Sequence, residues 1–304
     1  MTPPGPVVTP ARLAAATLAA LAGLALAVLG AALAQAGTGE LRIPAAGTTT
    51  LLRLFVLAAF AIHLGELAGA RIAGDGPLPR RWSPAAALLG AAATTGLLLL
   101  FAAVSGLGLT TVYGMREGRL LLVTANAFVL AALCAAGRRP ALALGPLAAA
   151  VLAEALRAHP ESAGPAIGAT LTVVHLTAAS LWCGALLHVL RTMRLRGRGG
   201  RAVLARYART AAWLCAALVV TGTCSALRRL PPDLVLGTAY GRVLLVKLGL
   251  VGLAGLLALA ARRRMLRGGN AQAPARTELG VLAAVVLVSA VLTVVPDPHW
   301  LSPA

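Results

Sequence analysis

Histidine is the residue type in this chain with the clearest potential for metal chemistry. There are five histidines in 304 residues. His175 lies inside an apolar segment, whereas His159 and His299 each lie just beyond one. Imidazole binds copper, zinc, iron and nickel, and a thiolate such as that of Cys224 favours Cu(I). The predicted metal-ligating set is therefore His175, His159, His299 and Cys224.

A second group of ionisable residues lies within the apolar segments, where a charge is costly. His63 and Glu66 are three residues apart and so share one helix face. With Glu154 and Lys247 they form a candidate relay for a metal ion or a proton. The alternatives are structural: a hydrogen-bonded His63–Glu66 pair, and a Lys247 side chain that reaches the membrane interface. His188 stands next to a strongly basic stretch and is expected at that interface.

No residues form a recognisable enzyme motif. The chain has no GxxxxGK[ST] phosphate-binding loop. Its serine, histidine and acidic residues do not assemble into a nucleophile motif. The four cysteines include no CxxC pair, so a disulfide framework is not expected. We therefore predict a protein that is not an enzyme.

The elements that position these residues are predicted to be membrane-spanning helices. The chain is 59% hydrophobic and has only nine Asp and Glu residues, too few to cover a soluble surface. Its apolar blocks are long enough to cross about 30 Å of hydrocarbon as helices, the form in which a single segment satisfies its own backbone in lipid. We predict an all-α bundle of nine spans, over residues 13–34, 51–72, 84–104, 119–136, 140–158, 166–190, 207–227, 241–261 and 278–295.

The net charge of +18 is assigned to membrane topology. Most arginines lie between apolar blocks rather than on a folded polar surface, which argues against a nucleic-acid partner. With the N-terminus inside, roughly two thirds of the 27 Lys and Arg residues fall on the inner side. The sequence thus predicts a multi-pass protein of the plasma or inner membrane, with the N-terminus inside and the C-terminus outside.

Two units are expected along the chain. Residues 1–50 contain a transmembrane helix and an outer loop, and residues 51–304 form an eight-helix membrane domain. The tripeptide at 32–34 resembles a signal-peptidase site. The apolar stretch before it is longer than the roughly 7–15 residues of a signal peptide, so we predict a retained helix. Cleavage there would leave eight spans.

The segment around the sixth span carries a recognisable pattern. His175, Trp182 and Gly184 read His-x₆-Trp-x-Gly, and Tyr-Gly at 240–241 is followed by Lys247, a basic run, Glu278 at the start of the last span, and a final proline. This pattern resembles the copper resistance protein D family. The resemblance is good over 166–298 and fainter over 51–165, where the match around His159 is loose.

The resemblance implies an inner-membrane copper-handling protein that works with a periplasmic or extracellular CopC-type copper-binding protein. It implies copper interaction at His175 and makes Trp182, Gly184, Gly241 and Lys247 positions to test, the glycines through packing. His63 and Glu66 are not part of the pattern.

Three functions follow from these observations. In the first, copper docks outside near His159 and His299, passes to His175 and moves inward past His63 and Glu66. In the second, His63 and His175 ligate a b-type haem, which is the less favoured cofactor. In the third, the protein is a metal-free membrane scaffold for copper-oxidase assembly. The sequence leaves the copper oxidation state and the oligomeric state open.

Overall fold

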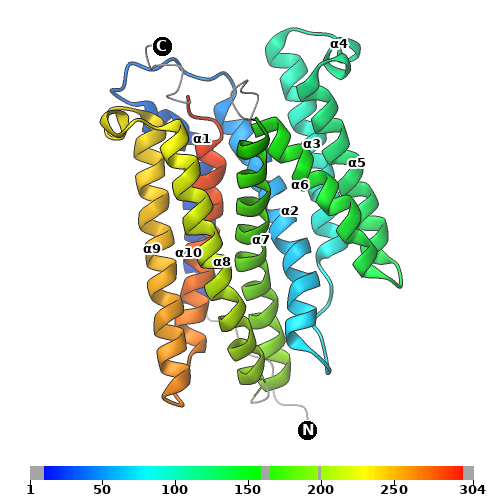
Figure 1. Ribbon diagram of the computed structural model, residues 1–304, viewed down its shortest axis with the longest axis vertical. Helices are drawn as coiled ribbons and strands as arrows, with labels where there is room; N and C mark the ends of the chain where they lie inside the picture. The colour runs from blue at the N-terminus through cyan, green and yellow to red at the C-terminus, as the bar shows by residue number, and fades with distance from the viewer. Residues whose placement is uncertain (1–9, 159–164, 198–199, 297–304) are drawn as a thin grey trace.

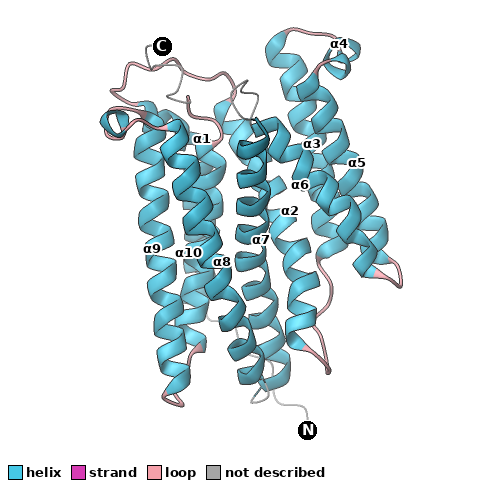
Figure 2. Cartoon of the chain, in the orientation of Figure 1, coloured by secondary structure: helices cyan, strands magenta, loops and turns pink. Residues whose placement is uncertain are grey.

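The chain folds into a bundle of long helices that run roughly along its longest axis (Figures 1 and 2). The computed structural model describes residues 10–158, 165–197 and 200–296. No strand occurs in these residues. The long helices are α1 (Pro10–Gln35), α2 (Ala46–Ala73), α3 (Ser83–Ser105), α5 (Arg116–Ala136), α6 (Leu144–Ala158), α7 (Pro165–Arg196), α8 (Gly200–Arg229), α9 (Ala239–Leu266) and α10 (Gln272–Leu292). Between them lie the short α4 (Leu109–Gly114) and two 3₁₀ turns, η1 (Pro140–Ala143) and η3 (Pro232–Leu234).

The predicted membrane fold is confirmed. Within the described residues, nine helical segments are long and apolar enough to cross a membrane, and they coincide with the nine predicted spans. The predicted ends differ most between the sixth and seventh spans. There α7 continues to Arg196 and α8 begins at Gly200, because arginine is a good helix former and its long side chain reaches polar surroundings from a helix end.

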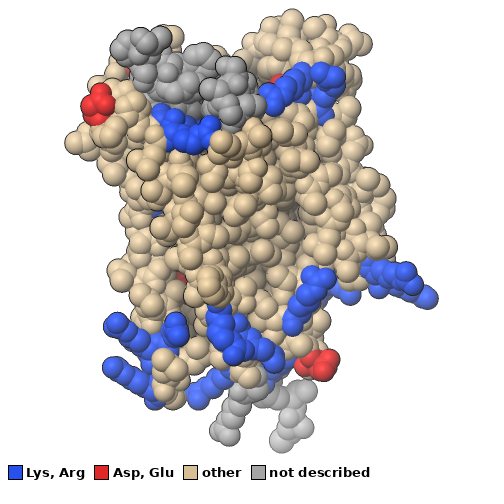
Figure 3. Space-filling view, in the orientation of Figure 1, with Lys and Arg blue, Asp and Glu red and all other residues tan. Residues whose placement is uncertain are grey.

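The helix ends form two layers (Figure 1). We call the layer where α2, α5, α7 and α9 end and α3, α6, α8 and α10 begin the basic end. Figure 3 shows Lys and Arg side chains concentrated there, at the bottom of the view. The other layer is called the opposite end. By the excess of basic residues, the sequence predicts that the basic end faces the cytoplasm.

Two groups of helices meet where α2 packs against α7. One core cluster joins α2, α3, α5 and α6, with the rings of Phe60 and Phe128 4.8 Å apart between centroids. A second cluster joins α7 to α10 around Trp182. Between the groups, Gly65 of α2 and Gly184 of α7 bring the backbones into contact, and a Cβ on either glycine would collide with the other helix. Small residues permit this close approach in lipid.

The connection between α1 and α2 is attached to the start of α9. The Arg242 guanidinium donates to the carbonyl oxygen of Ala36 at 2.8 Å, just past the end of α1. The Glu40 carboxylate accepts from the backbone N–H of Ala239, the first residue of α9, at 3.1 Å. A cation at one helix end and an anion at the other complement the helix dipoles. These contacts link the end of α1 and the segment after it to α9.

Candidate functional site

The candidate copper ligand His175 lies ten residues into α7, about 15 Å from the opposite end by helical rise. Its Nδ1 atom is 3.0 Å from the hydroxyl oxygen of Thr221 in α8. Gly222 stands beside the ring, and a Cβ built there would come 3.4 Å from the imidazole Cε1. The imidazole is therefore fixed between two helices by one hydrogen bond and one close backbone approach.

The hydrogen bond determines which ring nitrogen is free for a ligand. The Thr221 hydroxyl donates its proton to the carbonyl oxygen of Ala217 at 2.7 Å. Its oxygen is then left to accept from His175 Nδ1–H. This tautomer keeps the lone pair on Nε2, which is the arrangement that a neutral imidazole needs to bind a metal ion.

Lys247 of α9 is a charged residue near His175. It lies eight residues into its helix, about 12 Å from the opposite end, and is close enough to act electrostatically on the imidazole. A cation here opposes a second positive charge at the same place. It therefore weakens the hold of the imidazole on a metal cation.

The other predicted metal ligands are not gathered around His175. Cys224 lies one helical turn beyond Thr221 toward the opposite end of α8 and is exposed. His159 and His299 lie outside the described residues. Within the residues that the structure describes, no group of three or more His, Cys, Asp or Glu side chains has metal-site geometry.

Trp182 belongs to a separate buried cluster that joins α7, α8 and α10. Its indole N–H donates to the Glu278 carboxylate at 2.9 Å, and its carbonyl oxygen accepts from the Tyr207 hydroxyl at 3.0 Å. The expectation that Glu278 opens the last span is wrong, because α10 begins six residues earlier, at Gln272. Glu278 is instead buried and joins α10 to α7 through Trp182.

Glu66 is the anchor of a charged cluster at the basic end. Its carboxylate accepts from the backbone N–H groups of Trp82 and Ser83, at 2.8 and 2.9 Å, at the start of α3. It also pairs with the Arg191 guanidinium at 2.8 Å, which stacks 3.7 Å from the centre of the Trp82 ring. Arg191 donates further to the carbonyl oxygen of Arg80. With these donors in place, Glu66 fixes the contact between α2, α3 and α7.

His63 and His188 are fully or almost fully buried, at 0% and 4% exposure, and neither ring has a hydrogen-bond partner among the described residues. The alternative of a His63–Glu66 hydrogen bond is therefore not realised. The expectation that His188 lies at the interface is also wrong, because its ring packs against Gly69 of α2. Buried imidazoles without partners are rare and point to a functional or water-filled setting.

Glu154 lies in a network of ion pairs near the opposite end. Its carboxylate accepts from Arg53 at 2.7 Å and from Arg157 at 2.9 Å, and Arg157 also pairs with Glu117 at 2.8 Å. The network joins α2, α5 and α6. Two arginines neutralise its two carboxylates, so Glu154 fixes helix positions in a region apart from His175.

Gly241 stands where the first turn of α9 meets the segment before it. Its N–H donates to the Thr238 hydroxyl at 3.1 Å, the N-cap bond of this helix. A Cβ at Gly241 would collide with the carbonyl oxygen of Val235. This glycine therefore sets the tight entry of the chain into α9.

The last three long helices match a known family. Residues 201–295 match the family model described as copper resistance protein D. This segment, about a third of the chain, is thus similar to the copper resistance protein D family. Among curated proteins and among solved structures, none matches the chain significantly.

The match to copper resistance protein D supports a copper-related protein, and the nine apolar helices of the described residues support a multi-pass membrane protein. The matched segment includes Thr221, Cys224, Lys247 and Glu278, whereas the His175–Trp182–Gly184 pattern lies before it. The sequence resemblance thus extends further along the chain than the family match. The part played by His175 rests on its geometry and on that resemblance.

Sequence reasoning missed Thr221 and misplaced His188. Thr221 carries no signal in the sequence, because threonine is common in helices and its partner lies 46 residues away. His188 was obscured by the arginines that follow it. His188 follows Gly184 by four residues and so lies on the same helix face. This spacing is the signal that would have placed it against α2.

Proposed function

We propose that this protein, which resembles the copper resistance protein D family, moves copper between the opposite end and the interior of the bundle, with His175 as its intramembrane ligand. The observation that carries the proposal is the Thr221 hydroxyl, which holds His175 Nδ1–H and leaves Nε2 available. Copper is the cargo in this scheme, and loose ligation suits cargo that must leave again.

The incoming copper is delivered at the opposite end, where His159 and His299 are the proposed docking residues and Cys224 is an additional soft ligand. A CopC-type copper-binding protein is the proposed donor, as the family resemblance implies. The sparse donors and the neighbouring Lys247 ammonium support brief occupancy at His175 rather than storage.

Movement beyond His175 uses neutral donors in this proposal. Glu66 and Glu154 are each occupied by arginines, which favours structural roles for both. His63 and His188 keep unpartnered nitrogens deeper in the bundle. We propose His63 and His188 as later positions toward the basic end, which copper reaches only after it leaves the contact between α7 and α8.

The first experiment is the copper, iron and zinc content per chain of protein purified after a copper challenge. Wild type is compared with His175→Gln, which keeps a polar side chain of similar size. Thr170→Val is the matched control, because Thr170 lies on the same helix, is exposed and bonds only within its helix. Copper is expected in wild type and in Thr170→Val, and to be lost in His175→Gln.

Cellular copper uptake then separates binding from movement. His63→Gln is expected to retain bound copper while uptake falls. Equal copper content and equal uptake in His175→Gln and wild type would overturn the proposal and favour a metal-free scaffold. Iron with a Soret band would favour the haem hypothesis.

A further inference from the structure

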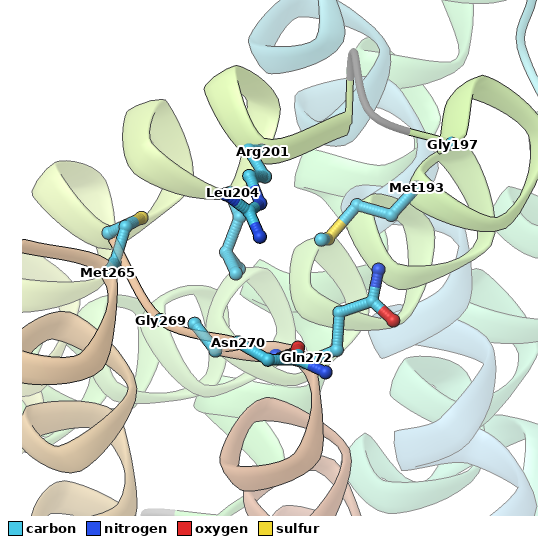
Figure 4. A pocket seen from close by; sticks show the side chains of 9 residues that line it. Met193, Gly197, Arg201, Leu204, Met265, Gly269, Asn270 and Gln272 are labelled. Carbon is cyan, nitrogen blue, oxygen red and sulfur yellow. Dashed lines mark hydrogen bonds between the residues drawn. The ribbon is translucent and has the colours of Figure 1, made fainter. Parts of the chain in front are cut away.

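A pocket at the basic end is separate from the proposed copper path. It has a volume of about 250 Å³ and lies between the α7–α8 and α9–α10 hairpins. In Figure 4 the side chains of Arg201, Met193 and Gln272 point into it from different helices. Its main side-chain lining consists of Met193, Arg201, Leu204, Met265, Asn270 and Gln272.

The polar groups that line the pocket are hydrogen-bond donors. Within the described residues, the Arg201 guanidinium has no ion-pair or hydrogen-bond partner. The Asn270 amide oxygen already accepts from the Gln272 backbone N–H at 2.9 Å, and the Gln272 amide oxygen accepts from Arg276 at 3.3 Å. The amide NH₂ groups of both side chains remain available. A ligand that fills this pocket must therefore supply acceptors.

The charge around the pocket points to an anion. Residues 191–209 contain seven arginines and residues 262–277 contain five, and neither stretch has an Asp or Glu. The helices α8 and α10 also begin at the pocket, with Gly200 and Gln272 as their first residues. The first N–H groups of a helix lack intrahelical partners and carry the positive end of its dipole, which adds to the attraction for an anion.

The depth of the pocket identifies the kind of anion. It lies where four membrane-spanning helices begin or end, which is the level of lipid headgroups. Leu204, Met193 and Met265 give it an apolar side next to the donors. Leu259 and Leu266 are exposed and give α9 an apolar outer surface near the same end. Basic pockets between helices on the cytoplasmic side bind anionic headgroups in membrane proteins.

We propose that this pocket binds the phosphate group of an anionic phospholipid. Arg201 and the amide groups of Asn270 and Gln272 hold the phosphate oxygens, and the acyl chains follow the apolar surface of α9. A lipid bound here joins the two hairpins α7–α8 and α9–α10 at the basic end. The proposal is independent of copper transport.

The test is lipid binding to the purified full chain in detergent, followed by native mass spectrometry. The protein is titrated with phosphatidylglycerol, with phosphatidylcholine, and with inorganic phosphate. Wild type is expected to retain phosphatidylglycerol in preference to the other two. Arg201→Gln is expected to weaken phosphatidylglycerol binding about tenfold, the loss expected for one charge-assisted hydrogen bond, and Arg201→Lys is expected to retain most of it.

Arg138→Gln is the matched control. Arg138 is exposed, stands just past α5 at the same end of the bundle, and does not line the pocket. The Arg138→Gln variant removes the same charge and is expected to leave binding of the first lipid unchanged. An equal loss of phosphatidylglycerol binding in both variants would mean that general surface charge attracts the lipid, and it would overturn the proposed site. Inorganic phosphate that binds as tightly as the lipid would overturn the lipid assignment, and equal binding of both lipids would overturn the anion preference.

Discussion

The orientation of His175 depends on Thr221, whose hydroxyl donates its hydrogen bond within its own helix. The Thr221 hydroxyl donates to Ala217 and can therefore only accept from the imidazole. A single side chain on α8 thus selects the tautomer of a histidine on α7. Partners of this kind often change metal affinity by 10- to 100-fold when they are removed.

Thr221→Val tests that dependence. Valine keeps the shape of the side chain and removes the acceptor, so the ring loses its fixed tautomer and orientation. Copper affinity of the purified protein, measured by competition with a chromogenic chelator, is expected to fall about tenfold. Thr124→Val is the control, because Thr124 is also buried and bonds its own helix at Leu120 but has no histidine partner. An equal fall in both variants would contradict the assigned role.

Gly222→Ala tests whether Nε2 must be reached past α8. The added methyl group comes 3.4 Å from His175 Cε1, an ordinary contact that the fold tolerates. It crowds the ring edge between the two nitrogens and is expected to slow copper binding several-fold while thermal stability is retained. Gly249→Ala serves as control, because a Cβ there meets nothing within 4 Å. Unchanged binding rates in Gly222→Ala would show that copper reaches the ring from another side.

At the scale of elements, α2 and α7 form the central helix pair, where the two groups of helices meet. Gly65 and Gly184 let their backbones touch, and Glu66 and Arg191 fasten the same pair at the basic end. His188 is enclosed by this pair, and the α7 face that carries His175 is turned toward α8. The crossing therefore determines where both histidines stand.

Gly184→Ala is expected to destabilise the fold. The new Cβ would overlap the carbonyl oxygen of Ala61, which belongs to backbone and cannot rotate away. Overpacking of this kind costs about 1–3 kcal/mol or more. Thermal unfolding in detergent measures it, with Gly280→Ala as control, since a Cβ at that helical glycine meets nothing within 4 Å. A melting temperature equal to that of wild type would mean that the helices can separate without cost.

Glu66→Ala is expected to cost more than a surface ion pair. It leaves Arg191 with a buried charge and frees two N–H groups at the start of α3. Removing one partner of a buried pair typically costs about 3–5 kcal/mol. The double variant Glu66→Ala with Arg191→Met is expected to recover part of that loss. Denaturation in detergent of wild type, Glu66→Ala, Arg191→Met and the double variant gives the coupling energy, and strictly additive effects would contradict the pairing.

The spans could be predicted from sequence because each is a long apolar block, and the physics of lipid leaves a helix as the structure for such a block. The helix ends around 191–206 could not, because arginine is compatible with both a helix and a polar loop. The site was less predictable. The individual residues His175 and Lys247 stood out as ionisable groups in apolar segments, but their partner Thr221 has no distinguishing type, and the helices that meet are not encoded in any local pattern.

For the whole molecule, the distribution of arginine over the two ends makes a prediction about direction. The basic end carries most arginines and the proposed lipid pocket, and His175 lies nearer the opposite end. If the basic end faces the cytoplasm, as the positive-inside rule indicates, copper reaches His175 from outside the cell membrane. Movement toward the basic end is then uptake.

Cysteine labelling on intact cells tests this orientation. In a variant without the four native cysteines, Asp75→Cys places an exposed thiol at the basic end and Asp233→Cys places one at the opposite end. A membrane-impermeant maleimide is expected to label Asp233→Cys on intact cells, and Asp75→Cys only after permeabilisation. The reverse labelling pattern would mean that the basic end faces outward. His175 would then lie near the cytoplasmic surface, and the same geometry would serve copper export rather than uptake.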